Sequence, residues 1–437
     1  MKREVEFLEE NITDNSKVII ACSGGPDSMC LLNLLIKLKE KKNLELIVAH
    51  VNHKLRSVSD NEAKMVEDYA KKNKVTFELQ ELDYQNTKFS EDDAHRKRYK
   101  FFKSLIKKYK ANYLVTAHHG DDLIETILMR IARGSNLNGY IGIKRVTQNE
   151  DYITLRPLLS TTKDEIIKYN ESENIPYAID ESNDSLKYTR NRYRKNVLPF
   201  LKNEDEYIHL KYLKFSEELE EYDNFVNNYI KEKDFIVDNQ LVINKIINES
   251  VFIKRKTIEL IVKSIQSNDY FNISDNQMKE LLKLIYNSNK SIDLNNGYQG
   301  INEYGYLKII KKQNNEYQEI ILDKDLEFLG FNFYYNCAEG NSSNNCIYLN
   351  SSEITLPLKL RTRCDGDKMQ VLNLGTKKVS DIFIDNKINK EIRDNFPILV
   401  DAKNNIIWLP SLKKSQFCKD KSEKYDIIIK CEARWIN

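Results

Sequence analysis

An apolar run that enters a glycine-rich turn near the start of the chain limits its fold more than any other stretch. Residues 17–21 read KVIIA, residues 23–28 read SGGPDS, and an apolar helix is predicted from Met29. A strand that passes through such a turn into a helix presents free backbone N–H groups and the positive end of a helix dipole, where phosphate can bind. The sequence therefore predicts a nucleotide site.

The spacing of the turn excludes two common nucleotide motifs. A Walker loop requires G-x-x-x-x-G-K-[ST], and a dinucleotide fold requires G-x-G-x-x-G. No Lys follows Gly25, and Asp27 stands where the loop becomes helix. The alternative is an ordinary Gly-Gly-Pro turn, but the upstream strand, the two serines and the apolar helix together favour a phosphate loop.

Length and composition indicate a soluble protein with several domains. At 437 residues, with 31% charged and 41% hydrophobic residues, the chain predicts two or three globular domains. The charged start, MKREVEFLEENI, is unlike a signal peptide and no apolar run reaches membrane-spanning length, so we expect a cytoplasmic protein that does not bind membranes. The seven cysteines form no C-x-x-C, which argues against a zinc ribbon, an iron–sulfur cluster or a disulfide framework.

The order of predicted elements gives the fold class. Strands are predicted at residues 44–51, 75–82 and 113–117, and helices from about residue 59 and over residues 90–109. This alternation predicts an α/β N-terminal domain, residues 1–202, with a doubly wound and mainly parallel sheet. A mostly helical middle domain with a short strand pair near residues 291–310 is predicted for residues 203–318, and a small α+β domain for residues 319–437.

Three acids follow the strand predicted at residues 113–117. In AHHGDDLIET, residues 117–126, Asp121, Asp122 and Glu125 follow His118 and His119 within the first turns of a predicted helix. Carboxylates this close repel one another unless cations offset them, so the cluster indicates a site for a cationic ligand. The alternative is a helix start with favourable capping acids, which explains one of the acids but not all three.

A basic segment without acids lies at residues 187–195. It holds lysines or arginines at positions 187, 190, 192, 194 and 195, with Tyr188 and Tyr193 among them. Such interleaving suits phosphate contacts and base stacking, with a solvated basic face as the alternative. Because the net charge of the chain is only +2, a nucleic-acid surface has to come from local clusters of this kind.

Taken together, the motifs resemble the tRNA(Ile)-lysidine synthase family of PP-loop ATP pyrophosphatases. SGGPDS, HVNHKLR, HHGDDLIET, RGSNLNGY, RPLL, DESN and RNRYR run in the family's order, and RTRCDGD, GTKKVSDIFID and RDNFPILVD look like the family's C-terminal domain. One position departs from the pattern. In AHRKRY, residues 94–99, His95 stands where the family usually has Arg.

The resemblance implies a ligase that forms a carbon–nitrogen bond. ATP adenylates O2 of the wobble cytidine, position 34, in an isoleucine tRNA with a CAU anticodon. Free lysine then attacks C2 and expels AMP, leaving lysidine. In this scheme ATP binds Ser23, Gly24, Gly25, Pro26, Asp27 and Ser28, with Mg²⁺ held by Asp27.

Further roles are implied for the other motifs. Asp27, His118 and Asp122 are the expected catalytic residues, and Asp121, Asp122 and Glu125 receive L-lysine or a second metal. The acceptor of the lysine proton stays open between the two histidines and a neighbouring carboxylate. The residues expected to contact tRNA are Arg190, Arg194, Arg361, Lys377 and Lys378. A homodimer is one candidate assembly.

Three other functions have less support in the sequence. A tRNA thiolase of the same superfamily would normally bring cysteine pairs, and a glutamine-dependent synthetase would bring a glutaminase domain; neither is visible in the sequence. A non-catalytic tRNA-binding protein is disfavoured by the intact Ser-Gly-Gly-x-Asp-Ser pattern.

Overall fold

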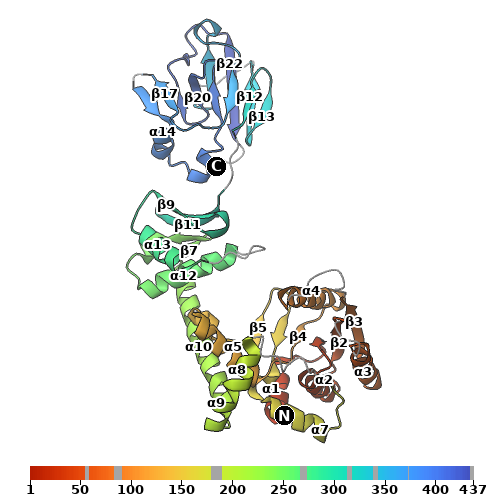
Figure 1. Cartoon of the computed structure of the whole chain (residues 1–437). Helices are drawn as coiled ribbons and strands as arrows, with labels where there is room; N and C mark the ends of the chain where they lie inside the picture. The colour runs from red at the N-terminus through yellow and green to blue at the C-terminus, as the bar shows by residue number, and fades with distance from the viewer. Residues whose placement is uncertain are drawn as a thin grey trace. The chain divides into compact units, whose positions relative to one another are not determined.

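The computed structural model describes residues 1–54, 59–82, 91–178, 189–265, 273–312, 317–337, 343–372 and 374–433. The chain forms two compact units, Met1–Asn228 and Tyr229–Asn437 (Figure 1). The domain boundaries predicted at residues 202 and 318 remain predictions. Three motif segments, at residues 55–56, 180–183 and 187–188, lie outside the described residues.

The first unit is built around a six-stranded sheet in the order β3-β2-β1-β4-β6-β5. Neighbouring strands pair in parallel, except for β5, which runs antiparallel to β6 at the edge. The strands are β1 (Lys17–Ala21), β2 (Glu45–Asn52), β3 (Thr76–Glu81), β4 (Tyr113–Val115), β5 (Val146–Gln148) and β6 (Ile153–Leu155). The central strands are apolar along their length because both faces of a parallel sheet are covered.

Helices cover both faces of this sheet (Figure 1). Side chains alternate along β1, so that Val18 and Ile20 pack toward one layer of helices while Ile19 packs toward the other. The first layer contains α1 (Lys2–Asn11), α2 (Pro26–Lys39), α3 (Ser59–Lys72) and α7 (Lys163–Ser172), and the second is α4 (Glu91–Tyr109).

The strand order reverses beside β1. The chain runs outward from β1 to β2 and β3, and then returns to the other side of β1 at β4. Ligands of doubly wound sheets bind outside the carboxyl ends of the strands where the order reverses. SGGPDS leaves β1 and AHHGDD leaves β4 at this place, so the fold brings the two motifs together.

The remaining helices of the first unit are α5 (Gly120–Arg133), α6 (Leu137–Tyr140), η1 (Pro157–Ser160), α8 (Thr189–Asn196), α9 (Leu198–Glu204) and α10 (Ile208–Glu232), which runs past the unit boundary. In α6 the Asn136 side chain accepts a hydrogen bond from Gly139 N at 2.9 Å and caps one helical turn. Thr162 and Glu165 form a capping box at the start of α7.

The second unit begins with a five-stranded antiparallel sheet in the order β7-β8-β11-β10-β9. Its strands are β7 (Ile236–Val237), β8 (Gln240–Val242), β9 (Lys290–Asp293), β10 (Tyr298–Glu303) and β11 (Tyr306–Lys311). The elements beside them are α11 (Ile243–Ile246), α12 (Val251–Ile265), α13 (Asp275–Leu284) and η3 (Asn295–Gly297). Strands of two or three residues carry too little alternation to be predicted, so β7 and β8 were not anticipated.

Two more sheets share one apolar core in the last part of the chain, where Phe331, Phe333, Phe396 and Trp408 are buried together. The first sheet is β12 (Glu319–Ile321), β16 (Lys359–Arg361), β19 (Ile398–Val400), β20 (Ile406–Leu409) and β21 (Lys413–Lys414). The second is β13 (Leu326–Phe328), β14 (Phe331–Tyr335), β22 (Ile427–Ala433) and β15 (Cys346–Leu349). The other elements of this part of the chain are a hairpin of β17 (Lys368–Val371) and β18 (Gly375–Lys378), and the helices η4 (Ser351–Glu353), α14 (Val379–Asp385) and α15 (Lys390–Arg393).

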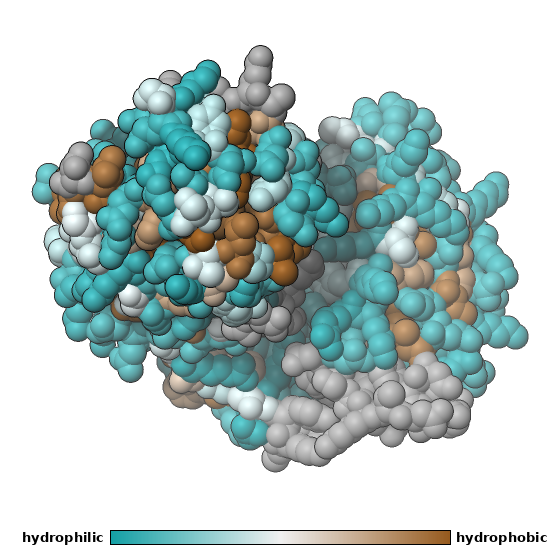
Figure 2. All heavy atoms as spheres, turned by 90° about the horizontal axis from the view of Figure 1, so that it is seen from above, coloured by the Kyte–Doolittle hydropathy of each residue, from teal (hydrophilic) through white to brown (hydrophobic). Residues whose placement is uncertain are grey.

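The predicted fold class is confirmed: a doubly wound α/β domain is followed by a part rich in helices and by a small α+β part. Most of the surface visible in Figure 2 is hydrophilic, with hydrophobic residues in smaller groups. Within the described ranges, every helix is too short or too polar to cross a membrane.

Candidate active site

The SGGPDS loop is folded around the hydroxyl of Ser28. Ser28 Oγ accepts hydrogen bonds from Ser23 N at 3.1 Å and Gly24 N at 3.2 Å, and donates to Gly25 O at 3.0 Å. Gly24 has a φ of +88°, a conformation that strongly favours glycine. A Cβ at Gly24 would also lie 3.2 Å from Val66 Cγ2 of α3. The conformation of the loop therefore depends on the hydroxyl of Ser28 and on glycine at position 24.

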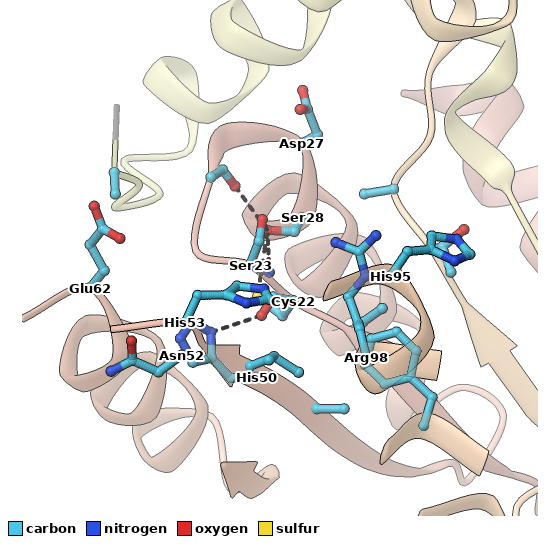
Figure 3. A pocket seen from close by; sticks show the side chains of 18 of the residues that line it. Cys22, Ser23, Asp27, Ser28, His50, Asn52, His53, Glu62, His95 and Arg98 are labelled. Carbon is cyan, nitrogen blue, oxygen red and sulfur yellow. Dashed lines mark hydrogen bonds between the residues drawn. The ribbon is translucent and has the colours of Figure 1, made fainter. Parts of the chain in front are cut away.

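Helix α2 starts where the loop ends. Gly25 is its N-cap and Pro26 its first residue, a position that suits proline because no intrahelical N–H bond is lost there. The first N–H groups of a helix lack partners within the helix, so the positive end of α2 faces the loop. The carboxylate of Asp27 points away from the hydroxyls of Ser23 and Ser28 (Figure 3).

A cavity of about 700 Å³ opens at the carboxyl ends of β1, β2 and β4. The loop contributes Ser23, Gly25, Asp27 and Ser28 to its lining, and the segment that follows β4 contributes His118 and Asp122. Its volume lies within the range of small-molecule sites, about 300–1,000 Å³. Two motifs that are far apart in the sequence thus share one cavity.

Aromatic and cationic side chains line the cavity beside β2 (Figure 3). His50 Nδ1 lies 2.9 Å from Cys22 O, and burial lowers the pKa of His50. On α4, the ring of His95 lies 4.5 Å from that of Tyr99, and Arg98 lines the cavity close by. The guanidinium that α4 supplies to this wall is therefore that of Arg98, while position 95 supplies an imidazole.

The acidic helix α5 is fixed at its first residue. Gly120 N donates to Thr161 O at 2.8 Å, and Asp122 Oδ2 accepts from His119 N at 3.1 Å. A Cβ on Gly120 would lie 2.9 Å from His209 Cβ and 3.1 Å from Thr161 O. Glycine is needed at position 120 because two neighbouring segments approach its backbone this closely.

Two arginines of α8 pair with two of the acids. Arg194 Nε lies 2.7 Å from Glu125 Oε1, and Arg190 Nε lies 2.8 Å from Glu125 Oε2. The same guanidinium groups reach Asp122 Oδ1, at 3.0 Å from Arg190 and 3.3 Å from Arg194. The Glu125 side chain is only 1% exposed, and a buried carboxylate needs such partners. Residues predicted to contact tRNA are therefore in direct contact with residues predicted to bind lysine.

The third acid is held by other groups. Asp121 Oδ2 accepts hydrogen bonds from Lys202 Nζ of α9 at 2.8 Å and from Lys163 N at 3.3 Å. Asp121 and Glu125 were expected, with Asp122, to receive one ligand, either lysine or a second metal. In the structure each has its own cations.

Burial and charge set the protonation of the residues at the start of α5. Burial lowers the pKa of His118 to about 4, although the Asp122 carboxylate opposes the shift. Burial alone would raise the pKa of Asp122, but the charges of His119 and Arg190 hold it at about 2. At neutral pH the site therefore contains a neutral His118 beside an ionised Asp122.

Lys163 and Lys202 were missed by sequence reasoning. Lys163 Nζ lies 2.7 and 2.8 Å from the two carboxylate oxygens of Asp27, and Lys202 binds Asp121. Lys163 directly follows a helix cap and Lys202 lies on a short helix. Lysines are common at such positions, so the local sequence does not indicate a role in the site. Only the three-dimensional fold brings them to the acids.

The basic residues predicted in the C-terminal part differ in exposure. Arg361 is buried, and its guanidinium binds both carboxylate oxygens of Asp367, at 2.9 and 2.8 Å. We therefore leave Arg361 out of the tRNA surface proposed below. Lys377 and Lys378 lie at the end of β18, where Lys378 is exposed and Lys377 is half-buried, 3.3 Å from Asp385.

The described residues contain no group of three or more His, Cys, Asp or Glu side chains arranged to hold a metal. Mg²⁺ commonly binds one or two carboxylates together with substrate phosphates and water. Asp27, with its side chain 27% exposed at the phosphate loop, fits that kind of site.

The comparisons agree with this geometry. Residues 1–201 match the family model described as a PP-loop domain, and residues 358–429 match the TilS substrate C-terminal domain. The first unit is thus a PP-loop domain, the class that the loop and the sheet order define.

Relatives extend the match over nearly the whole chain. It is 33% identical to tRNA(Ile)-lysidine synthase of Bacillus subtilis, covering 95% of this chain and 94% of the relative. It is 34% identical to the bifunctional protein TilS/HprT of Listeria monocytogenes serotype 4b, covering 98% of this chain and 70% of the relative. A crystal structure of a TILS C-terminal domain matches 27% of this chain and 98% of that one, with 30% identity and a TM-score of 0.26. The chain belongs to the tRNA(Ile)-lysidine synthase family.

Proposed function

We propose that this chain joins free lysine to C2 of the wobble cytidine in an isoleucine tRNA with a CAU anticodon. The observation that carries the proposal is that Asp27 of the phosphate loop and Asp122 of the acidic helix line the same cavity. A nucleotide and an amine substrate can therefore meet there. Membership of the family supplies the class of reaction.

The first step would transfer AMP to the base. O2 of the cytidine attacks the α-phosphorus of ATP, the bond to the bridging oxygen breaks, and pyrophosphate leaves. The N-terminal end of α2 and the N–H groups of its first turn would face the departing phosphates. Mg²⁺ held by Asp27 would neutralise part of their charge.

The second step would form the carbon–nitrogen bond. The ε-amine of lysine attacks C2, the C2–O2 bond breaks, and AMP leaves with O2. The nitrogen loses two protons over this step: the ammonium form, with an ordinary pKa of about 10.4, must release one before attack. The adduct loses the second, which His118, neutral because its pKa is about 4, can accept. Its Nδ1 lies 3.0 Å from Thr116 Oγ1, which orients the ring.

Lysine binding would require an exchange of cations. Asp122 and Glu125 are paired with Arg190 and Arg194, so an ammonium group can reach these acids only by replacing a guanidinium. Phosphates of the bound tRNA would give the displaced arginines new partners. Asp121, which is paired with Lys202, would add a third negative charge near the bound lysine.

The second unit would bind the body of the tRNA. Lys377 and Lys378 lie within the segment that matches the TilS substrate C-terminal domain, and we propose that they contact phosphates of the tRNA. A sulfur-transfer reaction has less support: Cys22, which lines the cavity, is buried, and burial raises the pKa of its thiol.

The test is incubation with radiolabelled lysine, ATP and a tRNA transcript that carries the CAU anticodon. We expect label in the tRNA and AMP release that depends on lysine. The control is a transcript with G in place of C34. Equal labelling of the two transcripts, or AMP release without lysine, would contradict the proposed function.

A further inference from the structure

The acid of the phosphate loop is paired with a cation from another helix. Lys163 Nζ contacts both carboxylate oxygens of Asp27, at 2.7 and 2.8 Å. The Lys163 side chain is 34% exposed and that of Asp27 is 27% exposed. The pair lies at the rim of the site, where solvent and ligands can reach it, so its partners can be exchanged.

The backbone of Lys163 is held firmly relative to the loop. Helix α7, which Lys163 opens, packs on α2: Asn170 Nδ2 donates to Pro26 O at 2.8 Å, and Tyr169 OH donates to Asn33 Oδ1 at 2.8 Å. Lys163 N itself donates to Asp121 at 3.3 Å. A change of partner for the ammonium group therefore needs only rotations within the flexible lysine side chain.

The loop also lacks a cation of its own. A Walker loop carries a lysine that reaches the β- and γ-phosphates, whereas SGGPDS carries an acid at the end of the loop. Lys163, 136 residues away in the sequence, brings an ammonium group to the same place. The tertiary fold thus brings to the loop a positive charge that the loop sequence itself does not contain.

We propose that Lys163 is a phosphate-binding residue that rests on Asp27 until Mg·ATP arrives and then pairs with the β- and γ-phosphates. The inference rests on the proposed ATP site, and not on lysine transfer or tRNA binding. Mg·ATP brings a cation for Asp27 and an anion for Lys163 at the same moment, so neither group loses its partner. A metal ion alone would have to displace the ammonium group without offering it a phosphate.

Two affinities of the full chain test this exchange, both measured by calorimetry without turnover. One is the affinity for Mn²⁺ alone, and the other is the affinity for a non-hydrolysable ATP analogue with Mg²⁺. We expect Lys163→Gln to weaken analogue binding at least tenfold and to strengthen Mn²⁺ binding severalfold. Lys163→Arg keeps the charge and should retain most of the analogue affinity.

The matched control is Lys168→Gln, which removes the same charge from an exposed position on the same helix. It should change neither affinity by more than twofold. Analogue affinity within twofold of wild type in a folded Lys163→Gln protein would overturn the phosphate role, and unchanged Mn²⁺ affinity would overturn the exchange. If the wild-type chain itself bound no analogue, the proposed ATP site, and with it the proposed function, would fail instead.

Discussion

Arg194 Nε lies 2.7 Å from Oε1 of Glu125, a carboxylate that is almost completely buried. The arginine therefore occupies the position that a substrate ammonium group would need in order to meet the same charge. An ion pair of this kind is costly to break unless a new cation replaces the old one. Under the proposed function, entry of lysine therefore requires Arg194 to move.

Glu125→Gln should raise the Michaelis constant for lysine about tenfold while leaving ATP and tRNA binding close to wild type. A carboxylate about 4 Å from an ammonium group contributes up to roughly 4 kcal/mol at an effective dielectric constant of 20, less the cost of desolvation. Steady-state kinetics with varied lysine measures the change. A collapse of ATP affinity or of its Mg²⁺ dependence, with the lysine constant unchanged, would identify Glu125 as a metal ligand.

Asp27→Asn should leave the fold intact and lower the rate of the adenylation step about a hundredfold, roughly 3 kcal/mol. The amide has nearly the same shape but cannot provide the negative charge that Mg²⁺ and Lys163 require. Single-turnover release of pyrophosphate is the measurement, with circular dichroism to check folding. Wild-type turnover in the folded variant would rule out this role for Asp27.

Gly120→Ala should destabilise the protein by about 1–3 kcal/mol and reduce activity. The added methyl group would meet His209 Cβ at 2.9 Å and Thr161 O at 3.1 Å, so the start of α5 or its neighbours must shift. Urea denaturation measures the stability. Gly134→Ala is a useful comparison: it meets no atom within 4 Å but has a φ of +71°, so any cost there is one of backbone strain alone. A Gly120→Ala protein as stable and active as wild type would contradict the packing argument.

Stability should fall as the pH is lowered from about 6.5 to about 4. The pKa of His118 in the folded protein, about 4, lies below its ordinary value of 6.5, so the unfolded chain takes up the proton first. The contribution of His118 is complete above pH 6.5 and is lost progressively toward pH 4. The pKa of Asp122 is lowered from its ordinary value of 3.8 to about 2, so this group changes the stability only at pH values below about 3.8.

His118→Asn should reduce this loss of stability by an amount on the order of 1–3 kcal/mol. Denaturation curves at pH 7, 5.5 and 4.5 for both proteins measure the difference. His50 and His53, whose pKa values are also lowered by burial, remain in the variant, so the slope should become shallower without disappearing. Identical pH dependence in the two proteins would show that His118 is not the group responsible.

Replacing Lys377 and Lys378 together by Gln should weaken tRNA binding and leave ATP binding unchanged. Each phosphate contact that is lost reduces the dependence of log K on log salt concentration by about 1. Binding titrations at several salt concentrations measure both quantities. An unchanged affinity and salt slope would place the tRNA surface elsewhere on the chain.

The loop and the sheet could be predicted because their signals are local. KVIIA and SGGPDS are adjacent in the sequence, and β-α alternation determines where the carboxyl ends of the strands meet. The same rules bring the segment after β4, with Asp122, to the cavity beside the loop. These parts of the fold depend on short stretches and on general rules of parallel sheets.

The pairing of the acids could not be predicted. Asp27 and Lys163 are 136 residues apart, and Asp121 and Lys202 are 81 apart, so only the packing of α7 and α9 brings them together. Arg361 was expected to contact tRNA, whereas in the structure it is buried and paired with Asp367. Burial of a charged side chain depends on a specific partner, and no periodic pattern records that partner.

Each acid of the site, whether Asp27, Asp121, Asp122 or Glu125, contacts a lysine or arginine of the chain itself. A living cell is rich in potassium ions and polyamines, and four bare carboxylates would collect them. Because lysines and arginines of the chain already neutralise these carboxylates, binding of such ions in the site is weakly favoured. The main competitor of the proposed lysine substrate is thus part of the same polypeptide, and its effective concentration does not vary with the ionic composition of the surroundings.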